Sequence, residues 1–236
     1  MAIKKLIFVD TNIWLDFYRA RSEAGLALLR HLEAIGGSII TTHQLESEFK
    51  KNRQVAILEG IEQLKPPQQL SRPGILSESK STKVLQKSLK EAEKRVKELR
   101  GRLARVLDDP SQNDIVYQTF QRIIHRDGDL GLTRENPLRR RIRSQAFRRF
   151  LHGCPPRKKT DTSIGDALNW EWMVHCALAK NAELVIVSRD SDYGVVFQDK
   201  WYINDHLRQE FSDRVSKKRK LLLYGKLSEA LKHFKV

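Results

Sequence analysis

The sequence predicts an α/β fold of three layers, α/β/α, in which helices cover both faces of a central, mostly parallel sheet. Three observations predict it. Short apolar runs alternate with helical patterns near both ends of the chain. The run at 184–188 (Leu-Val-Ile-Val-Ser) is almost wholly apolar, as in parallel strands that are buried on both faces. A basic, helical stretch at about 70–155 separates these halves, and we interpret it as a hairpin-like insertion within one domain spanning 1–236.

Each element follows from a local pattern of apolar residues and helix breakers. The first half predicts a strand at 4–9, helices within 13–32, a strand at 39–42 and a helix at 44–64. Gly36-Gly37 ends the helical pattern of 13–32, and Pro66-Pro67 ends the helix at 44–64. The second half predicts a helix at 165–180 and strands at 184–188 and 221–224. In such a sheet, functional groups gather outside the carboxyl ends of the strands.

The insertion begins with a long helix. Apolar residues alternate at spacings of four and three, at Leu85, Leu89, Ala92, Val96, Leu99, Leu103 and Val106. This pattern is typical of a helix packed along another helix. Asp109-Pro110 ends the helix, and 115–124 is the expected antiparallel partner. A coiled coil between two chains is the alternative. The hairpin within one chain is favoured because the pattern extends over only about three heptads.

Charge is the strongest compositional signal. The 236 residues carry 44 Lys and Arg against 29 Asp and Glu, a formal net charge of +15. Such a surplus predicts attraction to polyanions, with nucleic acid favoured over an anionic membrane. Residues 134–160 hold much of the surplus, and Phe147 and Phe150 among them are available for packing or stacking. The predicted nucleic-acid contacts in this stretch are Arg139, Arg140, Arg141, Arg143, Arg148 and Arg149; a merely solvated basic face is the alternative.

Several classes of protein are disfavoured. No segment approaches the ~20 apolar residues of a membrane span, and the first residues lack the pattern of a signal peptide, so we expect a cytoplasmic protein. Cys154 and Cys176 are too few for a disulfide framework and are expected to be reduced. The histidines lack zinc-site spacing, and neither a phosphate-binding Gly-rich loop nor a Gly-x-Ser-x-Gly elbow is present.

Acidic residues mark the expected strand ends. Asp10 ends the first strand, while Asp190 and Asp192 follow the strand at 184–188; Glu48 and Asp166 lie on helices that flank this edge of the sheet. Five converging carboxylates would repel one another, so such a cluster requires cations or shifted pKa values. Mg²⁺ and Mn²⁺ prefer oxygen ligands. Taken singly, each Asp could equally be a turn or helix-capping residue.

The order of these motifs resembles that of PIN-domain nucleases. Residues 8–14 (Phe-Val-Asp-Thr-Asn-Ile-Trp) resemble the opening motif of that family, and similar motifs follow at 44–49, 163–168 and 188–192. The likeness is closest to a larger PIN-like subfamily with a helical insertion, and it covers about 1–60 and 150–236. The haloacid-dehalogenase-like phosphatases also place an Asp after the first strand, but their second Asp is replaced here by Asn12.

The resemblance implies roles for individual residues. The metal-binding set would be Asp10, Glu48, Asp166 and Asp190, with Asp192 as a fifth catalytic acid. Glu46 competes with Glu48, and the match at 49–53 favours Glu48. Asn12 and Ser188 resemble the polar positions that orient the acids, and Glu171 is a candidate for the edge of the cluster. Further candidate phosphate contacts are Arg53, Lys158 and Lys159.

The resemblance implies an endonuclease that uses one or two Mg²⁺ or Mn²⁺ ions, acts on RNA in preference to DNA, and leaves a 5′-phosphate and a 3′-hydroxyl. A role as a toxin or as an effector of antiviral defence fits the family. A non-cleaving module that binds RNA or a partner, and a nuclease acting on DNA, are the alternatives. An inhibitor or regulatory protein and a homodimer are left open as partners.

Overall fold

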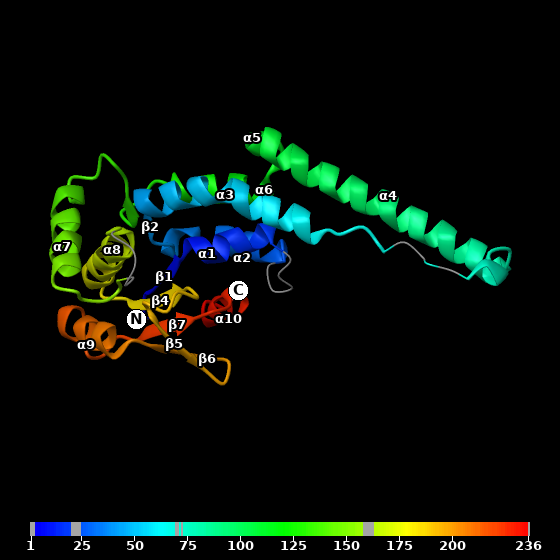
Figure 1. Cartoon of the computed structure of the whole chain (residues 1–236). Helices are drawn as coiled ribbons and strands as arrows, with labels where there is room; N and C mark the ends of the chain where they lie inside the picture. The colour runs from blue at the N-terminus through cyan, green and yellow to red at the C-terminus, as the bar shows by residue number, and fades with distance from the viewer. Residues whose placement is uncertain (1–2, 20–24, 69–70, 72, 158–162, 236) are drawn as a thin grey trace.

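The computed structural model describes residues 3–19, 25–68, 71, 73–157 and 163–235 (Figure 1). In chain order, the strands are β1 Lys5–Val9, β2 Thr41–Thr42, β3 Gly131–Leu132, β4 Glu183–Val187, β5 Gly194–Phe197, β6 Lys200–Ile203 and β7 Leu221–Tyr224. The α-helices are α1 Thr11–Leu15, α2 Ala27–Ala34, α3 His43–Gln63, α4 Lys80–Asp108, α5 Pro110–Asn113, α6 Ile115–Ile124, α7 Arg139–Leu151, α8 Gly165–Lys180, α9 Asp205–Arg214 and α10 Leu227–His233. Short 3₁₀ turns occur at Asp16–Tyr18, Gly36–Ser38 and Gly74–Leu76.

The central sheet is parallel and has the order β1-β4-β7. Val9 pairs with Val187, which pairs in turn with Tyr224, so the three strands end at the same edge. Every residue of β4 is buried, which requires cover on both faces of the sheet. The α/β/α architecture predicted from the sequence is therefore confirmed.

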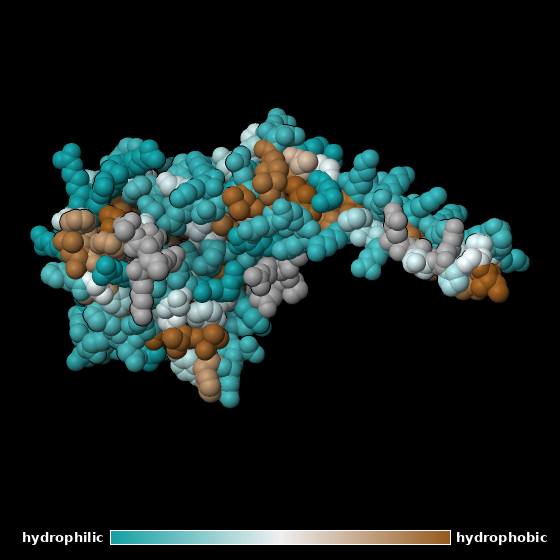
Figure 2. Space-filling model, in the orientation of Figure 1, coloured by the Kyte–Doolittle hydropathy of each residue, from teal (hydrophilic) through white to brown (hydrophobic). Residues whose placement is uncertain are grey.

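The second predicted strand is shorter than 39–42. Ile39 makes a single parallel bridge to Ile7 of β1, and only Thr41–Thr42 forms β2, which pairs with β3. The β5–β6 hairpin was not expected. It projects beneath the sheet in Figure 1 and forms a brown patch in Figure 2, with Val195, Val196 and Phe197 exposed.

The middle of the chain separates into a buried part and a projecting part. Helix α6 lies in the core, where Phe120 stacks on Phe49 at 4.0 Å between ring centroids and meets Trp14 edge-on. Helix α4 packs its C-terminal end mainly against α3 rather than α6, and the rest extends away from the body (Figure 1). The expected pairing of α4 with 115–124 was therefore wrong: the apolar face of α6 faces the core, and Leu85 and Leu99 of α4 stay exposed.

Within the described ranges, no helix has both the length and the apolar character needed to cross a lipid bilayer.

Candidate active site

Asp10 occupies the end of β1 and is the N-cap of α1. One carboxylate oxygen accepts a hydrogen bond from the backbone N–H of Thr11 at 2.7 Å. The other accepts from Asn12 Nδ2 at 2.7 Å and from Ser188 Oγ at 2.5 Å. Asp10 is thus both a helix cap and part of a polar cluster, because parallel pairing of β1 with β4 brings Ser188 alongside it.

The electrostatic environment of Asp10 opposes its ionisation. The pKa of Asp10 is raised from 3.8 to about 6, chiefly by burial and also by the charges of Glu48 and Asp190, against the lowering effect of the hydrogen bonds from Ser188 and Thr11. An acid of this kind is costly to keep charged unless a cation lies nearby. The site therefore has the electrostatic character of a cation-binding centre.

Glu48 faces the same site from the second turn of α3. Its Oε1 accepts a hydrogen bond from Gln44 Nε2 at 2.7 Å and its Oε2 accepts one from Thr11 Oγ1 at 3.2 Å. The competing Glu46 instead forms an ion pair with Lys50 at 2.6 Å. The geometry thus separates the two glutamates, and Glu48 is the one beside Asp10.

Gly165, the first residue of α8, lets that helix approach Glu48 closely. A Cβ atom at this position would lie 2.7 Å from both Glu48 Oε1 and Gln44 Nε2, so the ends of these two side chains would have to shift. The absence of a side chain therefore lets the start of α8, with Asp166 next along the chain, lie against α3.

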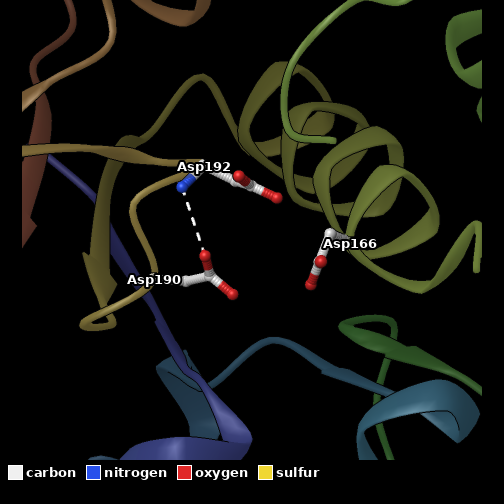
Figure 3. Close-up of side chains that lie close together, drawn as sticks. All are labelled: Asp166, Asp190 and Asp192. Carbon is white, nitrogen blue, oxygen red and sulfur yellow. Dashed lines mark hydrogen bonds between the residues drawn. The ribbon is translucent and has the colours of Figure 1, made fainter. Parts of the chain in front are cut away.

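Asp166, Asp190 and Asp192 converge on one point (Figure 3). Asp166 comes from the first turn of α8, whereas the other two follow β4, and ligand oxygens of all three lie within 4.8 Å of one another. The turn after β4 is held by hydrogen bonds from the Asp190 N–H to Ser188 Oγ, 3.0 Å, and from the Asp192 N–H to Asp190 Oδ1, 3.2 Å. Three clustered carboxylates are a donor set that suits Mg²⁺ or Mn²⁺.

Four of the five predicted acids border an open cleft of about 640 Å³. Asp10, Glu48, Asp166 and Asp190 all line it, together with polar side chains that include Lys51, Asn12 and Asn52. The fold therefore brings all five predicted acids to the same edge of the sheet, since Asp192 joins Asp166 and Asp190 in their cluster.

Other residues at the site were not anticipated from the sequence. The Tyr193 hydroxyl is buried without a hydrogen-bond partner among the described residues, and burial together with the charges of nearby acids, Asp166 foremost, raises its pKa well above 10. Arg189 forms a two-pronged ion pair with buried Asp16, joining the turn after β4 to the start of the chain. Tyr193 and Arg189 each lie next to a predicted acid in the sequence, and this proximity was the only indication in the sequence that they belong to the site.

Two arginines predicted to contact phosphate are buried in ion pairs instead. Arg53 donates to Asp114 at 2.7 Å and is 5% exposed. Arg149 is 8% exposed and donates to Glu171 at 2.9 Å and to Glu210. Neither guanidinium is available to bind nucleic acid, so both predictions were wrong.

Glu171 is not at the edge of the acid cluster. Its carboxylate is taken up by Arg149 and by Arg214, the latter at 2.8 Å. Among the remaining arginines of α7, four are exposed and Arg139 is half-buried; the exposed ones are Arg140, Arg141, Arg143 and Arg148. Lys158 and Lys159 lie outside the described residues.

Comparison with protein families matches residues 7–193 to the PIN domain, which includes the β1 edge, α3, α8 and the turn after β4. The match spans most of the chain, so the protein belongs to the PIN-domain family. Comparisons with curated proteins and with solved structures gave no match.

Proposed function

We propose that this PIN-domain chain is an endonuclease that uses Mg²⁺ or Mn²⁺ to hydrolyse phosphodiester bonds, with RNA as its substrate. The observation that carries the proposal is the convergence of carboxylates from the β1 edge, α3, α8 and the turn after β4 on one cleft. Their mutual repulsion, and the pKa of about 6 for Asp10, favour a bound cation.

Asp166, Asp190 and Asp192 would hold the cation, with Asp10 and Glu48 completing its surroundings. One or two divalent ions held there would polarise the scissile phosphate and lower the pKa of an attacking water. Asn12 and Ser188 fix the orientation of the Asp10 carboxylate through their hydrogen bonds.

The exposed arginines of α7 would bind the sugar-phosphate backbone. Such contacts release counterions, so each one removed lowers the salt dependence of binding by roughly one unit of slope. Converting Arg140 and Arg143 to Gln should flatten that slope, as measured by titrating a labelled oligonucleotide at several salt concentrations. An unchanged slope would assign these arginines to structure alone.

The preference for RNA, a cytoplasmic location and a role as toxin or antiviral effector complete the proposal. The RNA preference and the role rest on the likeness to the family, and the location rests on the two free cysteines, Cys154 and Cys176. A regulatory partner and a homodimer remain candidates. A non-cleaving binding module and a nuclease for DNA are the alternatives that the experiment separates.

The test incubates end-labelled single-stranded RNA and DNA of matching sequence with the protein in Mn²⁺, Mg²⁺ or EDTA, beside the Asp10→Asn and Asp166→Ala variants. We expect cleavage of RNA that requires metal and is lost in both variants, with their folds retained by circular dichroism. Binding without cleavage in every condition would favour the binding module, and cleavage of DNA alone would change the substrate. Full activity in both variants would refute the proposed site.

A further inference from the structure

We propose that Phe147, flanked by Arg140 and Arg143 on α7, forms a binding site for an unpaired nucleobase beside the acid cleft. The inference rests on the proposed function and narrows its substrate to a strand that is single at this point. A basic surface without an aromatic ring would not distinguish a single strand from a duplex, because the phosphates are accessible in both.

The arrangement of α7 sets these residues apart from its other arginines. At ~100° per residue, positions 140, 143 and 147 fall within about 60° of one another around the helix axis. Arg141 and Arg148 lie on another side, and Ile142 with Ala146 form the buried face.

Phe147 is an exposed aromatic ring in these basic surroundings. Its exposed fraction is 52%, and Figure 2 shows apolar side chains among hydrophilic ones over α7. The neighbouring Phe150 is different, because it is half-buried and the Arg157 guanidinium lies over its ring at 4.7 Å. Within the described part of the chain, no other ring or cation stacks on Phe147. Among the described residues, its face is therefore left open to a ligand.

This surface is continuous with the acid cleft. Arg140, Arg143, Phe147 and Ser163 line one shallow pocket, and Ser163 also lines the cleft that holds the acids. Ser163 precedes Asp166 by three residues. A strand whose phosphate lies at the acids would thus reach α7 with its neighbouring nucleotides.

The chemistry of the pocket favours a single-stranded nucleic acid as occupant. Bases stack on aromatic rings irrespective of sequence, and guanidinium groups bind phosphates or stack on bases. In a duplex, base faces are covered by their neighbours, so the ring would gain nothing. An anionic membrane could bind the same arginines. A membrane-binding surface, however, has no reason to adjoin a cleft lined by carboxylates.

The test measures binding to a single-stranded RNA of about 15 nucleotides and to the corresponding duplex, in EDTA so that cleavage does not interfere. Phe147→Ala should weaken binding to the single strand by about 5-fold or more and leave duplex binding nearly unchanged. Phe147→Trp should retain the affinity. Phe197→Ala removes a ring that is 62% exposed on the β5–β6 hairpin and is the matched control, expected to bind as wild type.

A second readout reports stacking directly. With 2-aminopurine placed in turn along the strand, wild-type protein should alter the fluorescence at one or two positions, and Phe147→Ala should abolish that change. Equal weakening of single strand and duplex, or no weakening of either, would overturn the inference. So would a Phe147-dependent binding to phosphatidylglycerol vesicles without the RNA effect.

Cleavage assays in Mn²⁺ separate this inference from the proposed function. If wild type cleaves RNA but Phe147→Ala binds the single strand normally, the base site is wrong and the nuclease stands. If no condition gives cleavage but the ring-dependent binding is found, the base site stands and the nuclease is wrong. A wild-type protein that binds neither nucleic acid would refute both.

Discussion

Replacing Asp10 by Asn should stabilise the metal-free protein at neutral pH while abolishing its proposed activity. Because burial raises the pKa of Asp10 from 3.8 to about 6, the folded protein binds this proton more tightly than the unfolded chain. The stability that protonation provides is therefore present below about pH 3.8 and is lost as the pH rises through about 6. At 1.36 kcal/mol per pH unit, the loss amounts to about 3 kcal/mol at pH 8.

The pH dependence isolates this contribution. About half of the loss, roughly 1.4 kcal/mol, falls between pH 5 and pH 8. The variant has no ionisable group at position 10. The difference in free energy of unfolding between the variant and wild type should therefore increase by about 1.4 kcal/mol from pH 5 to pH 8. Constant effects, such as altered hydrogen bonds with Asn12 and Ser188, cancel when the two pH values are subtracted.

Urea unfolding in EDTA, followed by the fluorescence of the buried Trp14, Trp170 and Trp172, measures the required free energies. The control is Asp127→Asn, which removes one carboxyl group from an exposed position, and the pH dependence of Asp10→Asn is compared with it. A difference for Asp10→Asn that does not change with pH would refute the reasoning, because Asp10 would then lack the raised pKa from which the effect is calculated.

Three further predictions concern the contact at Gly165, the ion pairs of Arg149 and the binding of Mn²⁺. Gly165→Ala should lower the cleavage rate by about 10-fold or more, because the new methyl group displaces the Glu48 carboxylate and the Gln44 amide. Gly101→Ala, which meets nothing within 4 Å, should leave cleavage rates unchanged. Arg149→Met should cost about 3 kcal/mol in urea unfolding, because it removes one of the two arginines that neutralise Glu171 and Glu210 and leaves Arg214 alone with both carboxylates; the same change at exposed Arg148 should cost far less, and equal costs would contradict the buried ion pairs. Mn²⁺ at 100 times its dissociation constant should stabilise the wild type by about 2.7 kcal/mol, and Asp166→Ala should lose most of this gain; a gain that is unchanged in the variant would place the ion elsewhere.

The sequence predicted those elements whose residues carry their own pattern. β1 and β4 are mainly apolar runs, and α3 and α8 carry helical patterns, so their positions were found within a few residues. Because parallel strands end at a common edge, the acids that follow β1 and β4 had to lie near one another. The meeting of the acids at one edge was therefore an inference from topology.

Charged residues were harder to place, because a sequence gives no indication of which opposite charge a side chain will meet. Arg149 looked like its exposed neighbours on α7, and only the packing of α7 and α9 around α8 buried it between Glu171 and Glu210. Arg53 met Asp114, 61 residues further along the chain. The packing partner of α4 depended on tertiary structure in the same way, because the apolar face of α6 packs into the core and α4 contacts α3 instead.

The sequence by itself thus determined the strands β1, β4 and β7, the helices α3 and α8 and the identity of the acids beside them, since these depend on periodicity and on the order of elements. Only the tertiary structure decided which basic side chains face solvent and which neutralise buried carboxylates, because that choice depends on contacts between residues far apart in the chain. The same contacts left Phe147 exposed beside the acid cleft.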